Sequence, residues 1–303
     1  MGIKRDYLMF VDTNIYLDFY RAQTDVGLKL LRRLESIPGK LISTYQVEME
    51  FKKNRQKVLL GTIEQLKTPN RVSPPVFVSE YKYVKKINQE IRNTSDRITR
   101  LKKTIKRILS YPNTYDEVYK ICKKIFNKEI EYTLYRLHEE RFKIRRLARK
   151  RFFLGYPPRK DKDVSFGDAI NWEWAIECCA RNKKDLIIVS RDSDYGSIYA
   201  GESFINDWLL KEFRERVGTR RKIVLTNKLS KGLEILSIPI STQEQEEEQK
   251  LYSTAGALKI QFPELAFTPE LLKNYFDTMA GVKKALSDMK INPYEVKRTN
   301  DET

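Results

Sequence analysis

Carboxylates that follow strand-like segments are the side chains of this 303-residue chain best placed to do chemistry. Asp12 comes directly after the apolar run Tyr7–Val11, and Asp192 and Asp194 follow the apolar run Leu186–Ser190. The carboxyl ends of neighbouring parallel strands meet at one edge of a sheet, where α/β proteins bind their ligands. We therefore expect these three acids to converge.

Further acids lie early in helices that are expected to begin at the same edge. Glu48 and Glu50 follow the strand-like run Leu41–Tyr45, and Asp168 stands at the start of a helical segment. Acids gathered in one place repel each other unless cations lie between them. Mg²⁺ and Mn²⁺ prefer oxygen ligands, commonly a few carboxylates together with substrate phosphate. The set therefore predicts a site for one or two such ions, and two ions about 3.5–4 Å apart can promote hydrolysis of a phosphodiester.

Each of these acids also has an ordinary structural explanation. An aspartate after a strand more often forms a turn or caps a helix than binds a metal. Asp168 alone could be a favourable charge in the first turn of its helix. The combination, and not any single residue, favours a metal site.

The single histidine and the three cysteines argue against other common catalytic sites. A Ser-His-Asp triad, a Cys-His pair or a multi-histidine zinc site would each need His138, which lies in a basic helical stretch without a neighbouring nucleophile. The cysteines have neither disulfide nor zinc spacing. Carboxylates remain the candidates, and a reducing, cytoplasmic location is expected.

The net charge of +17 and the pI near 9.6 predict a polyanionic partner, either nucleic acid or an anionic membrane surface. The longest apolar runs are far too short to cross a bilayer. We therefore expect nucleic acid and no membrane segment.

Alternating strand and helix patterns on both sides of a helical region predict the fold that must position the acids. Residues 7–66 read as strand, helix, strand, helix, and residues 168–226 read as helix, strand, helix, strand. This alternation indicates an α/β fold with a central parallel sheet and helices on both faces.

From Glu80 to Arg151 the pattern changes to amphipathic helix. Apolar residues recur every three or four positions from Val84 to Ile108, and a second helical stretch follows the break at Tyr111–Asn113. We predict a helical hairpin in which the two arms bury their seams on each other.

This helical region also holds most of the excess charge. It contains 22 Lys and Arg against 9 Asp and Glu. A solvated helix face would explain mixed charges, but one-sided charge on this scale repels itself and favours a nucleic-acid partner. The candidate nucleic-acid-binding residues are Arg145, Arg146, Arg149 and Lys150.

Aromatic residues interleaved with these charges have two explanations, stacking on unpaired bases or burial in the hairpin seam. They are Tyr81, Tyr83, Tyr132, Tyr135 and Phe142.

The chain is thus expected to have three parts. These are a discontinuous α/β domain of residues 1–79 and 152–240, a basic helical insertion of residues 80–151, and a C-terminal part of residues 241–303. The last part would comprise a solvated linker or exposed helix over Gln243–Gln249 and a helical element over Glu270–Met289.

Four motifs, in order, resemble those of PIN domains. They are Phe10-Val11-Asp12-Thr13-Asn14-Ile15, Gln46-Val47-Glu48-Met49-Glu50-Phe51, Phe166-Gly167-Asp168-Ala169-Ile170-Asn171-Trp172 and Ile187-Ile188-Val189-Ser190-Arg191-Asp192-Ser193-Asp194-Tyr195. Each motif alone is weak, but the ordered set is fairly specific. The resemblance covers roughly residues 6–79 and 155–227, and the fuller match is to a PIN-like family with a long basic helical insertion.

The resemblance implies a three-layer α/β/α fold and a Mg²⁺- or Mn²⁺-dependent nuclease, most often one that cuts RNA. It implies as metal ligands Asp12, Glu50 (favoured over Glu48), Asp168 and Asp192. Asp194 would complete a second metal site or only support it. Asn14 would orient Asp12 or a water, with a helix cap as its alternative role.

The leading functional hypothesis is an endoribonuclease in a toxin-like or defence setting. The second is a structure-selective DNA nuclease, since flap-type nucleases resemble PIN domains and also use helical elements to thread a strand. The third is an inactive PIN-like module that only binds nucleic acid, which is disfavoured because all four acidic positions are filled.

Overall fold

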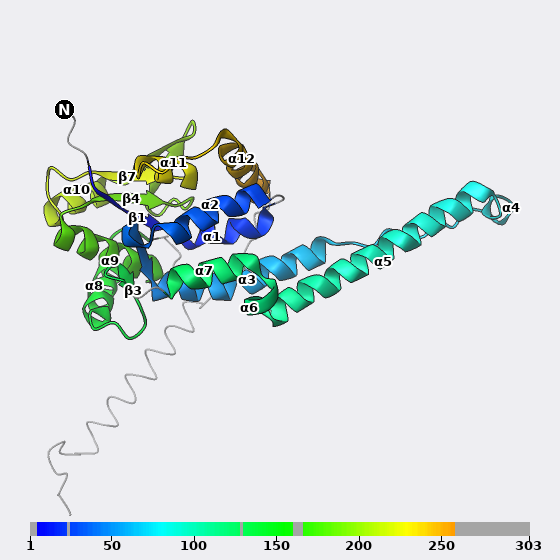
Figure 1. The fold of residues 1–303 in the computed structure, drawn as a ribbon, viewed down its shortest axis with the longest axis horizontal. Helices are drawn as coiled ribbons and strands as arrows, with labels where there is room; N and C mark the ends of the chain where they lie inside the picture. Colours follow the sequence, from blue (N-terminus) through cyan, green and yellow to red (C-terminus); the bar gives the residue numbers. More distant parts are fainter. Residues whose placement is uncertain (1–4, 23–24, 128–129, 160–165, 258–303) are drawn as a thin grey trace, which may run out of the picture. The chain divides into compact units, whose positions relative to one another are not determined.

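A five-stranded parallel sheet lies at the centre of the fold (Figure 1). The computed structural model describes residues 5–22, 25–127, 130–159 and 166–257. Within these ranges the strands of the sheet occur in the order β3-β2-β1-β4-β7, and every neighbouring pair is parallel. Their bounds are Tyr7–Val11 (β1), Leu41–Thr44 (β2), Thr133–Leu134 (β3), Asp185–Val189 (β4) and Ile223–Thr226 (β7).

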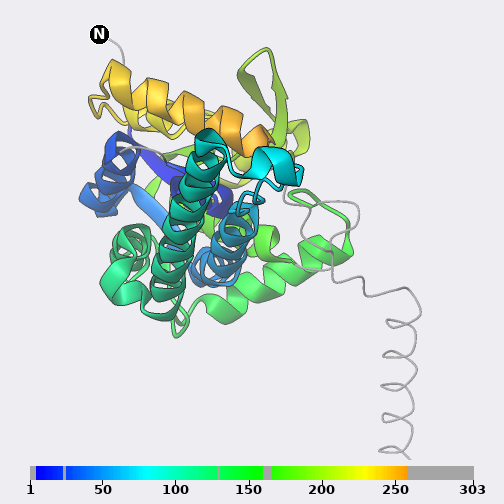
Figure 2. The ribbon, with the colours of Figure 1, turned by 90° about the vertical axis from the view of Figure 1, so that its right-hand side faces the viewer.

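Helices cover both faces of this sheet, so the predicted three-layer α/β/α fold is confirmed (Figure 2). Helix α9 (Gly167–Asn182) packs against β2 and β4. Helix α11 (Leu229–Ile235) packs against β4 and β7, and its Gly232 approaches Val189 and Met9 so closely that an added Cβ would meet their side chains. Strands buried on both sides explain why β4 is apolar along most of its length and does not alternate.

The structure also contains ten further α-helices and a short antiparallel hairpin within the described residues. The other α-helices are α1 (Thr13–Asp18), α2 (Asp25–Ser36), α3 (Tyr45–Gln65), α4 (Val76–Ser79), α5 (Lys82–Ser110), α6 (Pro112–Tyr115), α7 (Glu117–Phe126), α8 (Arg141–Phe153), α10 (Asp207–Arg216) and α12 (Thr242–Ala257). Strands β5 (Gly196–Tyr199) and β6 (Glu202–Ile205) form a separate antiparallel hairpin, which the sequence patterns did not predict.

The prediction of a helical hairpin in the insertion is wrong in its second arm. The first arm is the single helix α5, as its seam indicates, but the second stretch is divided into α7, β3 and α8. Helix α7 packs on α2, β3 pairs with β2, and α8 packs on α9. Most apolar residues of the second stretch are therefore buried against the α/β fold, where neighbours on several sides exclude water better than one basic helix could, whereas Leu137 is exposed.

Helix α5 packs instead on α3 and on α4, and residues 66–110 will be called the arm. Its base is held by a buried ion pair between Arg55 of α3 and Asp116, with 2.7 Å between Nε and Oδ2. The Tyr20 hydroxyl donates to the same carboxylate, and Arg55 also donates to the carbonyl of Ile108 near the end of α5. These contacts fix the end of α5 to the middle of α3.

The prediction of a solvated linker or exposed helix over Gln243–Gln249 is correct only in part, because the segment is helical and four of its residues are exposed, but three of its glutamates are buried. Helix α12 buries Glu244 and Glu248 against α2 and α11. Arg33 donates two hydrogen bonds to Glu244, which together with bonds from Ser241 lower the pKa of this carboxyl to about 2. Glu248 accepts the N–H groups of Leu229 and Ser230, the first residues of α11. The helix predicted over residues 270–289 lies outside the described residues.

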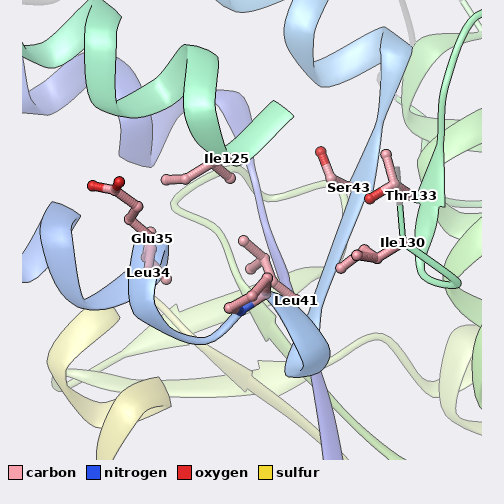
Figure 3. A pocket seen from close by; sticks show the side chains of 8 residues that line it. Leu34, Glu35, Leu41, Ser43, Ile125, Ile130 and Thr133 are labelled. Atoms are coloured by element: carbon pink, nitrogen blue, oxygen red, sulfur yellow. The ribbon is translucent and has the colours of Figure 1, made fainter. Parts of the chain in front are cut away.

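A cavity of about 10 Å³ lies between α2, α7 and the start of β2 (Figure 3). It is room for about one water molecule. Its lining includes Leu34, Leu41 and Ile125, and none of the candidate acids. In the described part of the chain no helix is long and apolar enough to span a membrane.

Candidate active site

The ends of β1 and β4 bring two of the acidic motifs together. The register pairs Val11 with Val189, and the N–H of Asp12 donates to the carbonyl of Val189 over 2.9 Å. Asp12 therefore lies beside Ser190, whose hydroxyl donates to Asp12 Oδ2 over 2.6 Å and accepts the N–H of Asp192 over 3.1 Å. Ser190 joins the motifs, and the expected pairing of the two strands could have identified it from the sequence.

Asp12 is buried and its carboxylate is held in a fixed orientation. It accepts the N–H of Thr13 over 2.6 Å as the N-cap of α1, and the side-chain amide of Asn14 over 2.9 Å. The structural and functional explanations of Asp12 therefore do not compete, because the same carboxylate can cap α1 and face the other acids. Asn14 lies inside α1, so it is not the cap but a donor to Asp12.

Helix α3 turns Glu50, and not Glu48, toward this strand edge. Glu50 accepts hydrogen bonds from the Thr13 hydroxyl over 3.0 Å and from the Gln46 amide over 2.6 Å. Glu48 forms an ion pair with Lys52 one turn further along α3. Residues four apart share a helix face, whereas residues two apart do not, which separates the two glutamates.

The start of α9 lies directly against Glu50. A Cβ added to Gly167 would stand 2.6 Å from Glu50 Oε1 and 2.5 Å from the Gln46 amide nitrogen. Asp168 follows in the first turn of α9. Thr44 at the end of β2 donates to the buried Asn171 side chain over 2.6 Å, which fixes α9 to the same edge. The glycine before Asp168 is the sequence signal for this close approach.

Tyr195 lies among the acids, buried at the end of the loop after β4. Its own burial and the charges of four carboxylates raise the pKa of its hydroxyl well above the ordinary value. Those carboxylates belong to Asp168, Asp12, Asp194 and Glu50. Asp194 is itself buried, whereas Asp192 and Asp168 are half-buried.

The electrostatics of Asp12 reflect this crowding. Burial, and then the charges of Asp192 and Glu50, raise the pKa of Asp12 to about 7 from its ordinary value of 3.8. Hydrogen bonds from Ser190 and Thr13 act in the opposite direction, because they stabilise the carboxylate. The site therefore concentrates negative charge that a cation would relieve.

The donor atoms at this edge fit a hard divalent cation. Among the described residues no three His, Cys, Asp or Glu side chains are already arranged to hold a metal ion. The available donors are nevertheless all oxygens, the type that Mg²⁺ and Mn²⁺ prefer. The buried Oδ1 of Asn14 and the hydroxyl of Tyr195 also lack a hydrogen-bond partner within the described ranges, as would suit atoms that bind an ion's water shell.

Helix α8 carries the candidate basic residues alongside this site. Arg145 donates to the Tyr45 hydroxyl over 2.8 Å and lies over its ring, and Tyr45 is the first residue of α3. Arg149 lies over the ring of Phe166, which immediately precedes α9. Arg146 and Lys150 are exposed on the same helix.

The interleaved aromatic residues divide between the two predicted environments. Tyr132 is buried, Tyr135 is half-buried, and Tyr81, Tyr83 and Phe142 are more than half exposed. The single histidine has a structural role, since Nδ1 of His138 accepts the N–H of Glu140.

A comparison with protein families agrees with this geometry. A family model described as a PIN domain matches residues 9–195, more than half of the chain. The matched range includes all the acids of the candidate site and the insertion. No curated protein and no solved structure matches the chain.

Proposed function

The chain belongs to the PIN domain family, and we propose from this premise that it is a metal-dependent endoribonuclease. Members of this family are typically metal-dependent nucleases. The choice of RNA, cleavage within the strand and a mechanism with two metal ions are our proposals for this chain.

The observation that carries the proposal is the convergence of acids around Asp12 and Tyr195. Asp192 and Glu50 both raise the pKa of Asp12, and Asp168 and Asp194 join them around Tyr195. We assign metal binding to Asp12, Glu50, Asp168 and Asp192, with Asp194 completing a second metal site or supporting it.

Mg²⁺ or Mn²⁺ bound there would supply a water of lowered pKa and would stabilise negative charge on the phosphate. The chain's own residues set the geometry. Ser190 and Asn14 hold the Asp12 carboxylate by donating to the same oxygen, and Thr13 at the start of α1 donates to Glu50. Gln46 holds the other oxygen of Glu50. These donors leave the acids little freedom to turn away from an incoming cation.

Substrate binding is assigned to the basic face of α8. Arg145 and Arg149 flank the starts of the two helices that carry Glu50 and Asp168, so a phosphate backbone held by α8 would pass beside the acids. Arg146 and Lys150 extend this contact. Phosphate contacts of this kind orient a strand without reading its sequence.

A DNA nuclease that recognises branched structure is the second candidate. The long α5 favours it, because a helical element beside an acidic site can guide a displaced single strand. The third candidate, a module that binds without cutting, is not favoured by any contact at the acidic edge.

Cleavage assays with purified full-length protein test the proposal. Labelled single-stranded RNA, single-stranded DNA and flap DNA are incubated with Mg²⁺, Mn²⁺ or EDTA. We expect metal-dependent cleavage within the RNA, lost in Asp12→Asn, Asp168→Asn and Glu50→Gln.

Glu48→Gln is the matched control, since Glu48 lies on α3 but pairs outward with Lys52. It should cleave like the wild type. Cleavage that survives in Asp12→Asn combined with Asp168→Asn would refute the site, and preferred cutting of flap DNA would favour the second candidate.

A further inference from the structure

The outer end of the arm exposes an unusual amount of aromatic and apolar surface. Val76 and Phe77 in α4 are 87% and 81% exposed. Tyr81 and Tyr83, just before and inside the start of α5, are 51% and 59% exposed, and their rings stack with centroids 5.4 Å apart. Apolar side chains clustered in solvent commonly mark a binding surface. These four residues will be called the arm tip.

Packing and hydrogen bonds fix the arm tip to α5. Val84 beneath it is buried. The side-chain amide of Asn88 donates to the carbonyl of Val72 and accepts its N–H, both over 3.0 Å, so that the chain before α4 is fixed to α5. Between the two lies a hollow of about 750 Å³ whose lining includes Arg71, Lys85 and Arg92. Cations therefore line a hollow at the same end of the arm that exposes the aromatic rings.

The charge of α5 indicates what the arm tip binds. Its 29 residues, Lys82–Ser110, include ten Lys or Arg and two acids. A second copy of this chain would bring like charge against like charge along such a helix, which disfavours self-association. A basic surface with exposed rings fits a nucleic-acid strand, because the phosphates follow the cations and unpaired bases stack on the rings.

The length of α5 places this contact far from the acids. A helix of 29 residues is about 43 Å long. The C-terminal end of α5, opposite the arm tip, is bound to Arg55 through the carbonyl of Ile108. Arg55 lies only about 8 Å along α3 from Glu50. A strand that reaches both the acidic edge and the arm tip must therefore extend over roughly 40 Å.

We propose that the arm tip is a second nucleic-acid contact, which stacks unpaired bases and gives the protein a preference for long single strands. Its link to cleavage rests on the nuclease function proposed above, but base stacking at the tip does not.

Binding is measured by anisotropy of labelled RNA in metal-free buffer with full-length protein. The probes are a single strand of about 20 nucleotides, one of about 6 nucleotides, and a duplex. Tyr81→Ala combined with Tyr83→Ala should weaken binding of the long strand by tenfold or more and leave the short strand unchanged. Tyr81→Phe with Tyr83→Phe should retain wild-type affinity, because phenyl rings still stack.

The matched control is Tyr111→Ala with Tyr199→Ala, two tyrosines that are 62% and 78% exposed away from the tip. This variant should bind all three probes like the wild type. If the tip variant lost as much affinity for the duplex as for the long single strand, the tip would contact the backbone and not unpaired bases. That result would overturn the proposal.

Two further measurements test whether the arm tip binds a membrane or a second copy of this chain instead of nucleic acid. Unchanged RNA affinity with lost binding to vesicles of anionic phospholipid would overturn the proposal in favour of a membrane. Unchanged RNA affinity with a changed oligomeric state in sedimentation would overturn it in favour of self-association. If the wild type cuts no substrate but binds the long strand through the tip, the proposed nuclease function fails and this inference stands.

Discussion

At the residue scale, three donors hold the Asp12 carboxylate, namely the N–H of Thr13, the side-chain amide of Asn14 and the hydroxyl of Ser190. Asp12, Asp192 and Asp194 follow apolar strands that are hard to mistake, so their common edge could be predicted. The expected strand pairing points to Ser190, whereas nothing in the sequence distinguishes Gln46 from an ordinary polar residue of α3, because its importance arises from its hydrogen bond to Glu50. Helix periodicity places Glu48 and Glu50 on different faces of α3, but it does not show which face meets the other acids.

The first prediction concerns the stability cost of the acidic cluster without metal. The pKa of Asp12 is about 7 in the folded protein and near 3.8 when unfolded. The folded state therefore binds more protons between these values, so stability should fall as pH rises from about 4 to about 7. Asp12→Asn should remove this contribution, because the Asn14 amide and the Ser190 hydroxyl can both reorient to accept from the new amide.

Thermal unfolding in EDTA at several pH values measures the effect. The wild type should lose stability toward neutral pH and regain it with Mg²⁺, whereas Asp12→Asn should be more stable at neutral pH and insensitive to Mg²⁺. A variant as pH-sensitive as the wild type would contradict the assignment.

The second prediction concerns the contact between α9 and α3. Gly167→Ala would force Glu50 and Gln46 aside, because the new Cβ would lie within 2.6 Å of both side chains. These side-chain ends can move, so we expect cleavage to fall by more than tenfold with little change in melting temperature. Gly39→Ala is the control, since no atom lies within 4 Å of its added Cβ. Equal activity in the two variants would show that the contact is unimportant.

At the scale of elements, local patterns predicted helices and strands but not always their partners. The seam of α5 was identified correctly, yet its predicted partner was not, since α7 and α8 pack on the α/β fold. The two-residue strand β3 is too short to leave a pattern, although it explains why the second arm is interrupted. In α12 a run of acids resembled a solvated surface because its buried partners, such as Arg33, lie far away in the sequence.

The third prediction tests how the arm is attached. Asp116→Ala leaves Arg55 buried without its carboxylate, so the free energy of unfolding should fall by about 3 kcal/mol or more. Replacing both residues, as Arg55→Met with Asp116→Leu, should cost far less. Glu117→Gln is the control, because the ion pairs of Glu117 with Arg32 and Lys120 are exposed and should each contribute about 0.5 kcal/mol or less. Urea unfolding gives the values, and equal losses for Asp116→Ala and Glu117→Gln would exclude a structural role for the buried pair.

The fourth prediction concerns α12 and acid. The pKa of Glu244 is lowered to about 2 by Arg33 and Ser241, so its stabilisation is fully present above about 4.5 and is lost as pH falls through 2. Glu244→Gln should cost on the order of 1–3 kcal/mol at neutral pH and less at low pH. Glu246→Gln, an exposed neighbour on the same helix, should be neutral. Denaturant unfolding at neutral and acidic pH measures these differences in the free energy of unfolding. If Glu244→Gln lowered it equally at both pH values, the ion-pair explanation would be refuted.

At the scale of the whole molecule, a strongly basic chain surrounds a small acidic centre. Composition alone predicted the polyanionic partner, because +17 exceeds what solubility requires. Composition could not show that Arg145 and Arg149 lie beside the acids, since that placement depends on how α8 packs on α9. Under the proposed function, the long-range field attracts nucleic acid to the protein and the contacts of α8 orient it.

The fifth prediction separates these two effects. Arg146→Glu with Lys150→Glu should weaken RNA binding and reduce the slope of affinity against salt by about one per lost phosphate contact. Arg220→Glu with Lys231→Glu changes the net charge equally at exposed positions elsewhere. It should slow association at low salt but leave the slope nearly unchanged. If both pairs lower the slope equally, α8 has no special role.

The attachment of the arm has a consequence for how such proteins can diversify. The arm leaves the fold along α3 and returns alongside it, so that Arg55 in the middle of α3 and Ile108 near the end of α5 are neighbours. Helical turns can then be added or removed between them without disturbing the sheet or the acids, whereas the segment carrying β3 is tied to the sheet. Relatives of this chain could therefore share one catalytic centre and differ in reach, with arm length an adjustable trait that evolution or protein engineering can change independently of catalysis.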